Sequence, residues 1–346
     1  MSSSGTSGGL LAAETCRAGG LGFVAAGHLN SKEALIKLER EINIFRQADT
    51  KDCYPLAIGF IGHSTFGSED GWRMFENILE DYQPQVIQCF APAISYHKER
   101  KNKNVVQIAH SYGCKIIAQV GTVEEGIQAL EAGVDAIIAQ GSEAGGHGVR
   151  REDGNGTLSL TARLVKIAAS QKKRVPVLAA GGISDGRGLI AALSLGADGV
   201  VLGTRLWASE ESIGPDNYKV ALLRASSGDD VVRTRVFDTI NNSYKDTKWP
   251  APYDSSGTLR NETTKTWDGR LPEVEDALRT DDESSEVRAF VSKYKQAEDD
   301  TNLAVVYCGE GVGEIDSIDP TFAIIQRIEN EAIEVLQNLQ KIVVEE

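Results

Sequence analysis

Residues 179–205 read AAGGISDGRGLIAALSLGADGVVLGTR, and this stretch carries the strongest indication of the fold. Two apolar segments end in small residues, at Gly181-Gly182 and at Gly203-Thr204, with one helical run between them. In a parallel β/α barrel, consecutive strands end at the same face, and the loops after the last two strands commonly hold a phosphate group. Glycine lets backbone N–H groups approach phosphate oxygens closely. The stretch therefore predicts a phosphate-binding pair of loops on a parallel barrel.

The same alternation of short apolar segments and helical runs continues back to residue 10. The apolar segments are almost uninterrupted, as in parallel strands that are covered by helices on both faces. Ser31, Thr122 and Thr161 have side chains typical of helix N-caps, and Gly133 and Gly196 suit helix C-termini. The predicted strands are 21–25, 56–61, 86–90, 115–120, 135–140, 175–180 and 199–202, and the predicted helices are 10–18, 31–47, 71–80, 123–131, 161–170 and 185–195.

These seven strands predict an α/β protein of the TIM (β/α)8-barrel type that lacks its first strand, because the complete barrel has eight. The polar residues 1–9 lead directly into the apolar helix at 10–18, so the missing strand is expected before that helix. Two interpretations fit the count: an N-terminally shortened chain, or an error in assigning the elements.

The net charge of −14 is confined to the C-terminal part of the chain. Residues 1–207 hold 21 Lys and Arg against 21 Asp and Glu, whereas residues 208–346 hold 15 against 29. The alternation of strands and helices also stops near residue 208. We therefore expect a cofactor-binding barrel at 1–207, an acidic appendage of helices and loops at 208–309, and a segment at 310–346 whose long amphipathic helix, residues 315–342, packs back on the barrel. The acidic charge argues against a nucleic-acid partner.

The five cysteines show neither a CxxC motif nor the spacing of metal ligands. Most of them lie in apolar runs, which is typical of reduced, buried thiols in an intracellular protein. No apolar run approaches the length that spans a membrane, and the sequence shows no targeting signal. We therefore expect a cytoplasmic protein without a membrane partner, although an organelle is not excluded by the sequence.

The loop after the predicted strand 135–140 reads GSEAGGHG, residues 141–148. Glycines on both sides of His147 favour a tight loop and would leave the imidazole as the only titratable group near a ligand above the barrel. Histidine changes its charge near neutral pH and is therefore suited to proton transfer. Position alone leaves two roles open, a catalytic histidine and a loop histidine that only hydrogen-bonds the backbone.

Other polar residues near the predicted strand ends have two interpretations each. Glu143 would either orient the loop histidine or face water. Arg150 and Arg151 would approach an anionic substrate or form a solvated pair. His63 and His97 follow strand ends, where they would line a pocket or lie at the surface or the edge of the core.

Several motifs together resemble the nitronate monooxygenases, formerly called 2-nitropropane dioxygenases, with the fungal members as the most similar branch. The resemblance covers about residues 8–211 and returns weakly at 309–332, while related FMN barrels share the phosphate-binding part. The motifs are AGGLGF at 18–23, QVGT at 119–122, AQGSEAGGH at 139–147, AGGI at 180–183 and GTR at 203–205.

The resemblance implies an FMN-dependent TIM barrel that oxidises alkyl nitronates with O2 to a carbonyl compound and nitrite. In the family pattern the histidine of the GGH loop is the catalytic residue, here His147, which acts as base toward a neutral nitroalkane or positions the anionic nitronate. Gln119 and Gln140, at strand ends, would face the flavin ring or the ribityl chain. The residues implied in FMN binding are Gln119, Gln140, Gly145, Gly146, Ala180, Gly181, Gly182, Gly203 and Thr204.

The chain departs from the family pattern at two places. The family normally opens with a strand and a Pro-Met loop that lies against the flavin, whereas residues 5–9 read GTSGG. The family often has Arg-Gly after the histidine, whereas Gly148-Val149 stands here. Three functions therefore stay open: a nitronate monooxygenase, an NAD(P)H-using FMN barrel such as a flavin-dependent enoyl reductase, and a shortened family member with impaired activity. The sequence does not predict an oligomeric state.

Overall fold

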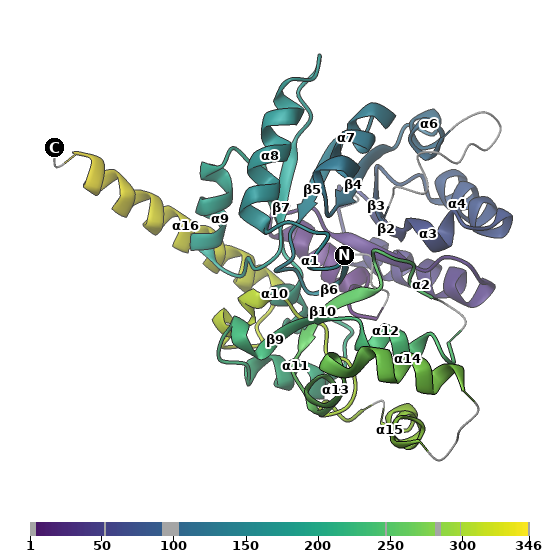
Figure 1. The fold of residues 1–346 in the computed structure, drawn as a ribbon. Coiled ribbons are helices and arrows are strands. Elements are labelled where there is room, and N and C mark those ends of the chain that lie inside the picture. The colour runs from purple at the N-terminus through teal and green to yellow at the C-terminus, as the bar shows by residue number, and fades with distance from the viewer. Residues whose placement is uncertain are drawn as a thin grey trace.

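The computed structural model describes residues 5–51, 53–91, 104–245, 248–280, 285–297 and 299–344. Seven parallel strands form one curled sheet with helices around its outer face (Figure 1), which confirms the predicted α/β fold of TIM-barrel type. Each predicted strand is found within two residues of its expected bounds. In order across the sheet the strands are β1 (Phe23–Gly27), β2 (Ala57–Ile61), β3 (Val86–Phe90), β4 (Lys115–Val120), β5 (Ala136–Gln140), β7 (Val177–Ala180) and β8 (Gly199–Val201).

Helices alternate with these strands and cover the sheet on its outer side (Figure 1). Large apolar side chains, among them Phe45, Phe60 and Phe75, are fully buried in the layer between helices and sheet. Burial of this layer is the main favourable contribution to the stability of the fold. The helices of the barrel are α1 (Gly9–Arg17), α2 (Lys32–Ala48), α3 (Gly62–Thr65), α4 (Glu69–Tyr82), α6 (Val105–Ser111), α7 (Val123–Ala132), α8 (Thr157–Ala169), α9 (Gly186–Ser194) and α10 (Thr204–Trp207).

The N-cap of α8 was predicted wrongly at Thr161. The helix begins four residues earlier, at Thr157, and Gly156 occupies the N-cap position. Glu143, from the loop after β5, accepts hydrogen bonds from the backbone N–H and the hydroxyl of Thr157 at 2.7 Å each. A carboxylate from another loop thus satisfies the first turn of the helix, so that no local capping residue is needed. The N-caps at Ser31 and Thr122 are confirmed.

The strands β1 and β8 are the two edges of this sheet. The N-terminal segment runs alongside β1: the N–H of Ala25 donates to the Ser7 carbonyl at 3.4 Å, and the Ser7 hydroxyl donates to the Phe23 carbonyl at 2.8 Å. The Thr6 carbonyl accepts a hydrogen bond from the N–H of Ile213, beyond α10, at 3.3 Å. Residues 6 and 7 therefore link β1, the first strand of the barrel, to the segment that follows α10.

A second sheet, which the sequence analysis did not predict, joins the barrel to the segment that follows it. Its strands are antiparallel, in the order β6 (Gly146–Gly148), β10 (Ser255–Leu259) and β9 (Val231–Thr234). Because β6 is part of the GGH loop, the segment after residue 208 pairs directly with this loop. The remaining elements of that segment are α11 (Asp216–Leu223), η1 (Gly228–Asp230), α12 (Val236–Asn241), α13 (Glu262–Trp267), η2 (Asp268–Arg270), α14 (Leu271–Arg279), α15 (Glu286–Lys295) and η3 (Glu310–Glu314).

The C-terminal helix α16 (Thr321–Val344) packs against α9 and α1, and its last turns extend away from the body of the protein (Figure 1). The helix was predicted to begin at residue 315 but begins at Thr321, because Asp319 pairs as a β-bridge with Ser209 and Pro320 precedes the first turn. The Glu211 carboxylate accepts hydrogen bonds from the N–H and hydroxyl of Thr321 at 2.9 and 2.7 Å. None of the helices in the described part of the chain is long and apolar enough to cross a membrane.

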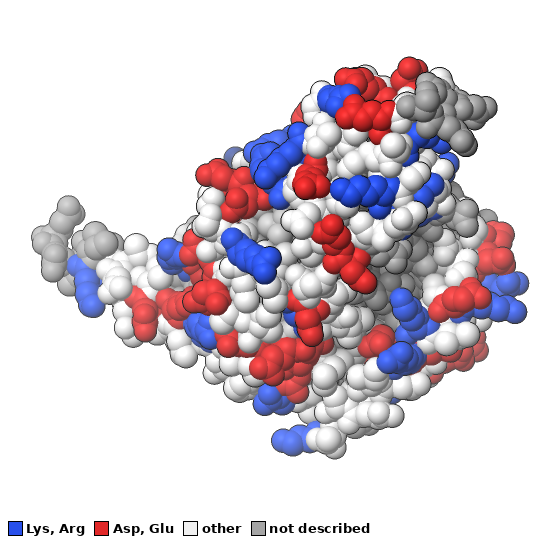
Figure 2. All heavy atoms as spheres, turned by 90° about the horizontal axis from the view of Figure 1, so that it is seen from below, with Lys and Arg blue, Asp and Glu red and all other residues white. Residues whose placement is uncertain are grey.

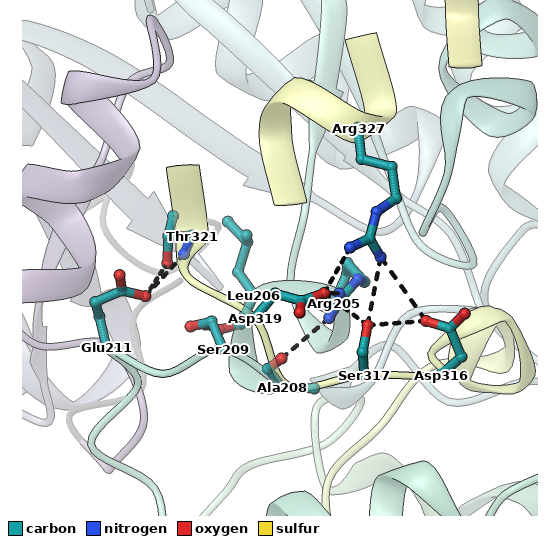
Figure 3. Close-up of polar contacts among 10 residues, drawn as sticks. All are labelled: Arg205, Leu206, Ala208, Ser209, Glu211, Asp316, Ser317, Asp319, Thr321 and Arg327. Carbon is teal, nitrogen blue, oxygen red and sulfur yellow. Dashed lines mark hydrogen bonds and ion pairs between the residues drawn. The ribbon is translucent and has the colours of Figure 1, made fainter. Parts of the chain in front are cut away.

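Arginines from the barrel and from α16 fasten this junction (Figure 3). Arg327 donates to the Asp319 carboxylate at 2.7 Å, and buried Arg205 lies 3.5 Å from the same carboxylate. Arg205 also donates to the carbonyl of Ala208 at 3.0 Å. The start of α16 is thereby held at the end of the barrel sequence.

Acidic and basic side chains alternate over the face that Figure 2 shows, rather than gathering into one basic area. Ion pairs such as Arg270–Glu273 at 2.8 Å link neighbouring charges in the segment after residue 208. Exposed pairs of this kind contribute little to stability, typically about 0–1 kcal/mol.

Candidate active site

A cavity of about 300 Å³ lies at the carboxyl ends of the parallel strands. This is the face at which barrel enzymes carry their active sites. The structure brings together around this cavity all ten residues that the sequence analysis singled out for catalysis or cofactor binding. They are Gln119, Gln140, Gly145, Gly146, His147, Ala180, Gly181, Gly182, Gly203 and Thr204.

The glycines after β7 form one end of the cavity. Gly181 and Gly182 have φ angles of +119° and +69°, a backbone conformation that other residues adopt only with strain. A Cβ atom at Gly181 would lie 2.7 Å from the hydroxyl oxygen of Thr157, so glycine is also required there by packing. The loop can therefore present its backbone to a ligand without side-chain bulk.

A third glycine-rich segment closes the same end of the cavity. Gly309 and Gly311 line it, and the N–H of Gly309 donates to the hydroxyl oxygen of Thr204 at 2.9 Å. The sequence analysis assigned only a weak resemblance to residues 309–332 and gave them no role in the site. Their contribution depends on how the C-terminal segment folds back, which local sequence patterns do not reveal.

Three glutamines lie on adjacent strands of the sheet, and two of them, Gln119 and Gln140, line the cavity. Gln88 of β3 donates from Nε2 to Oε1 of Gln119 at 2.7 Å, and Gln140 donates from Nε2 to the backbone carbonyl of His147 at 2.9 Å. The Oε1 atoms of Gln88 and Gln140 are buried and accept no hydrogen bond from the described residues. Gln140, which lines the cavity, therefore has an acceptor without a partner while it fixes the backbone of the GGH loop.

The GGH loop is held from outside the barrel by Arg233 of β9. This side chain donates to the carbonyl oxygens of Ser142 at 3.1 Å, Ala144 at 2.6 Å and Ser255 at 3.3 Å. Burial lowers the pKa of Arg233 to about 10, so the guanidinium remains charged near neutral pH. A buried cation thus stabilises the loop through its carbonyl oxygens.

His147 belongs to β6 and lies opposite Ser256 of β10. Its Nε2 atom is 2.8 Å from Oδ1 of Asp238 in α12, and the two side chains are only 11% and 5% exposed. The imidazole stacks on Trp249, with 3.8 Å between the ring centroids and 11° between the planes. The expectation that the imidazole would be the only titratable group near a ligand is wrong, because His28 and Tyr307 also line the cavity, and the appendage places a buried carboxylate next to the ring.

Two further imidazoles surround Trp249 on the barrel side. The rings of His28 and His63 lie 5.1 and 4.7 Å from the Trp249 ring. Burial, assisted by the neighbouring imidazoles, lowers the pKa of His28 to about 3, and burial lowers the pKa of His63 to about 4. Both rings are therefore neutral near pH 7. His28, which lines the cavity, could have been identified from the sequence, because it follows β1 as His63 follows β2.

Tyr307 is another aromatic residue beside His147. Its ring lies 5.4 Å from that of His147, and it lines the cavity. Burial, together with the negative charge of Asp238, raises the pKa of Tyr307 well above its usual value, so that the phenol stays protonated. Tyr307, Trp249, Asp238 and Arg233 were all missed by the sequence analysis, and no local motif marks any of them.

The remaining candidate side chains do not line the cavity. Glu143 caps the first turn of α8 through Thr157, so its carboxylate does not orient His147. Arg150 forms a two-pronged ion pair with Asp254 at 2.7 Å, and Arg151 is exposed. His97 lies outside the described residues.

Among the described residues that line the cavity, none is Asp, Glu, Lys or Arg. An anionic ligand in this part of the site would therefore be met by backbone N–H groups and by amide, hydroxyl, indole and imidazole groups. Such preorganised dipoles stabilise negative charge effectively where water is excluded.

Comparisons with known proteins give one consistent family. A family model described as nitronate monooxygenase matches residues 1–331. A nitronate monooxygenase of Neurospora crassa is 29% identical over 351 residues, which cover 96% of this chain and 88% of that protein.

Solved structures similar to this fold include FabK from Thermotoga maritima, with a TM-score of 0.72 and 25% identity over 99% of this chain and 94% of that one. A nitroalkane oxidase from Streptomyces ansochromogenes superposes with a TM-score of 0.70 and 25% identity, covering 97% of this chain and 94% of that one.

Proposed function

Because the chain belongs to the nitronate monooxygenase family, and is therefore an oxidoreductase of this type, we propose that it binds FMN and uses O2 to oxidise alkyl nitronates to a carbonyl compound and nitrite. The observation that carries the proposal is the position of His147 on the rim of a cavity that ends in the glycine loops after β7 and β8. Neutral nitroalkanes would be substrates to the extent that His147 can remove their α-proton.

The residues of the cavity fit FMN on two counts. Gly181, Gly182 and Gly203 line one end of the cavity without side chains, so a phosphate could lie directly against their backbone. The orphaned Oε1 of Gln140 can accept a hydrogen bond from a flavin ring N–H, and the Gln119 amide adjoins it on the neighbouring strand. These residues, with Gly145, Gly146 and Ala180, would hold the cofactor, and bound flavin would supply the redox chemistry.

The chain itself would contribute binding and proton transfer. His147 would take the α-proton of a neutral nitroalkane or hold the nitronate anion next to the flavin. The indole N–H of Trp249 and the protonated phenol of Tyr307 would be donors for the oxygens of that anion. Ile61 and Phe90 line the apolar part of the cavity, which suits an alkyl group.

The experiment that tests the proposal begins with the absorption spectrum of the purified protein after incubation with FMN. A stoichiometric complex with flavin bands is expected, followed by O2-dependent release of nitrite from a preformed alkyl nitronate. Anaerobic mixing with NADH separates the alternative of an NAD(P)H-using FMN barrel, because rapid bleaching of the flavin by NADH would favour it. A colourless protein that cannot be loaded with FMN would instead support an impaired family member.

A further inference from the structure

We infer that Asp238 is a positioning residue that holds His147 as the tautomer protonated on Nε2, so that Nδ1 is the atom that accepts the proton of a neutral nitroalkane. The inference rests on the proposed function for its substrate, but the geometry that carries it is a feature of the protein alone. Asp238 lies in α12, 91 residues from the histidine it contacts.

The hydrogen bond fixes which nitrogen carries hydrogen. An ionised carboxylate can only accept, so the 2.8 Å contact between Oδ1 of Asp238 and Nε2 of His147 requires hydrogen on Nε2. The Nδ1 atom of the ring makes no hydrogen bond with any described residue, and His147 lines the cavity. The lone pair on Nδ1 is therefore the basic site available to a substrate.

The surroundings of Asp238 make a charged carboxylate at this position energetically unfavourable unless a positive charge lies beside it. The carboxylate is 5% exposed, its Oδ2 atom accepts no hydrogen bond within the described chain, and no described Lys or Arg pairs with it. A buried carboxylate without a counter-charge is unfavourable. Proton uptake by His147 creates that counter-charge 2.8 Å away, so the carboxylate stabilises the product of proton transfer more than the starting state.

Four titratable groups near this pair, from other parts of the chain, are neutral near pH 7. His28 follows β1 and His63 lies in α3, and both have a pKa lowered by burial, to about 3 and about 4. Tyr294 of α15 and Tyr307 have a pKa raised by burial. Neither imidazole competes with His147 for a proton at neutral pH, and neither phenol is a base there.

Two other contacts keep the ring in place while the proton moves. Trp249 stacks on one face of the imidazole at 3.8 Å, and Gln140 holds the backbone carbonyl of His147 at 2.9 Å. In the proposed step the C–H bond of the nitroalkane breaks and an Nδ1–H bond forms. The electron pair of the C–H bond moves into the nitro group, giving the nitronate, and the hydrogen bond between Nε2 and Asp238 is kept.

The test is Asp238→Asn, compared with wild type on a neutral nitroalkane and on the preformed nitronate. The Asn amide can donate to Nε2, which would select the opposite tautomer and place the hydrogen on Nδ1. We expect kcat/KM for the neutral nitroalkane to fall by about 10²–10⁴, the usual contribution of a positioned base and its orienting carboxylate. For the nitronate, which needs no base, we expect a loss of less than about tenfold, since its α-proton is already absent.

Asp254→Asn is the matched control. Asp254 is also a mostly buried carboxylate of the appendage, but its partners are Arg150 and Arg235 rather than His147. We expect this variant to show the same ratio between the two substrates as wild type, whatever its stability. Equal losses on both substrates in Asp238→Asn, with flavin content retained, would mean that Asp238 only supports the shape of the pocket and would overturn the inference.

A second readout does not depend on turnover or on the cofactor. Nitrogen-15 spectra of histidine-labelled protein distinguish hydrogen on Nδ1 from hydrogen on Nε2, and the signal of His147 is identified by its loss in His147→Gln. We expect hydrogen on Nε2 in wild type and on Nδ1 in Asp238→Asn. An Nδ1–H tautomer in wild type, or an unchanged tautomer in the variant, contradicts the inference. If wild type has the expected tautomer but does not oxidise nitronates when loaded with FMN, the proposed function fails while the role of Asp238 as the orienting partner stands.

Discussion

The two sides of the cavity use different parts of the polypeptide. On the barrel side, the loops after β7 and β8 present backbone, with glycine at Gly181, Gly182 and Gly203. On the opposite side, the segment after residue 208 presents side chains, with Asp238 against His147 and Trp249 stacked on its ring. A backbone surface suits a phosphate, which is recognised by N–H groups, whereas a proton must be handled by a side chain of defined tautomer.

This difference predicts different consequences of substitution. A backbone surface is insensitive to most side-chain changes but does not tolerate an added Cβ where the loop is tightly packed. The opposite wall depends on single contacts, because His147 has one carboxylate partner and one stacked ring among the described residues. Damage to the barrel side should therefore remove the cofactor, while damage to the opposite wall should leave the cofactor bound and impair chemistry.

The largest effect is expected for Gly182→Leu, which tests the barrel side. Gly182 has φ +69°, and a Cβ atom there would lie 3.2 Å from Cβ of Glu143. A residue other than glycine in this conformation costs roughly 1–2 kcal/mol, and a leucine would press on Glu143 and displace the loop backbone that is proposed to bind the phosphate. We expect the purified variant to contain essentially no flavin, as measured by its visible spectrum.

Gly269→Leu is the control for that variant. Gly269 lies in η2, its φ is not in the left-handed region, and a Cβ atom there would meet nothing within 4 Å. We expect wild-type flavin content in this protein. If Gly182→Leu is folded by circular dichroism and still fully loaded with FMN, the assignment of the glycine loops to the phosphate is wrong.

His147→Ala tests the side of the cavity where chemistry is proposed. We expect kcat/KM for a neutral nitroalkane to fall by about 10²–10⁴, because the base is removed, while the flavin content stays that of wild type. Preformed nitronate should lose less activity, since its α-proton is already absent. An equal loss on both substrates would instead assign His147 to binding the anion.

The barrel side could be predicted from the sequence because its information is local. Glycines at positions 181, 182 and 203 stand where apolar strands end, and each strand is an apolar run of four to six residues with its own helix. The same rule, applied to β1, would have identified His28. Parallel strands buried on both faces are among the easier patterns to recognise, since they need no alternation.

The opposite wall could not be predicted in the same way. The contact between His147 and Asp238 joins residues 91 positions apart. It exists because β10 pairs with β6 in a register that sets Ser256 opposite His147, and because β9 carries Arg233 against the loop carbonyls. Neither the short strand β6, with its sequence Gly-His-Gly, nor the polar strand β10 has a pattern that indicates this pairing.

The acid stability of the protein offers a test of the neutral imidazoles on the barrel side. The folded-state pKa values of His28 and His63, about 3 and about 4, lie below the ordinary value of 6.5, so the unfolded chain binds protons at a higher pH than the folded chain. The stability that these two groups contribute is therefore fully present above about pH 6.5 and is lost as the pH falls toward 4. Each histidine should increase the slope of the unfolding free energy against pH by as much as about 1.4 kcal/mol per pH unit.

The measurement is urea unfolding of His28→Gln and His63→Gln between pH 4.5 and 6.5. In each variant the slope of the unfolding free energy against pH should be smaller than in wild type, by the equivalent of up to one bound proton. His110→Gln, which removes an exposed imidazole, is the comparison. Slopes equal to that of wild type in both variants would mean that these rings take up protons in the folded state, and that their surroundings are more polar than their burial indicates.

The smallest effect is expected for Trp249, and it sharpens the contrast between the two sides. Stacking of aromatic rings contributes about 0.5–1.5 kcal/mol beyond burial, which corresponds to roughly 2- to 10-fold in a rate or binding constant. We expect Trp249→Leu to lower kcat/KM for a neutral nitroalkane by this factor, because the His147 ring loses the surface that orients it at 3.8 Å. Trp249→Phe retains a ring and should recover most of the activity. Both variants should bind FMN as wild type does, since the glycine loops are untouched, and loss of flavin from Trp249→Leu would show that the two sides of the cavity are not independent.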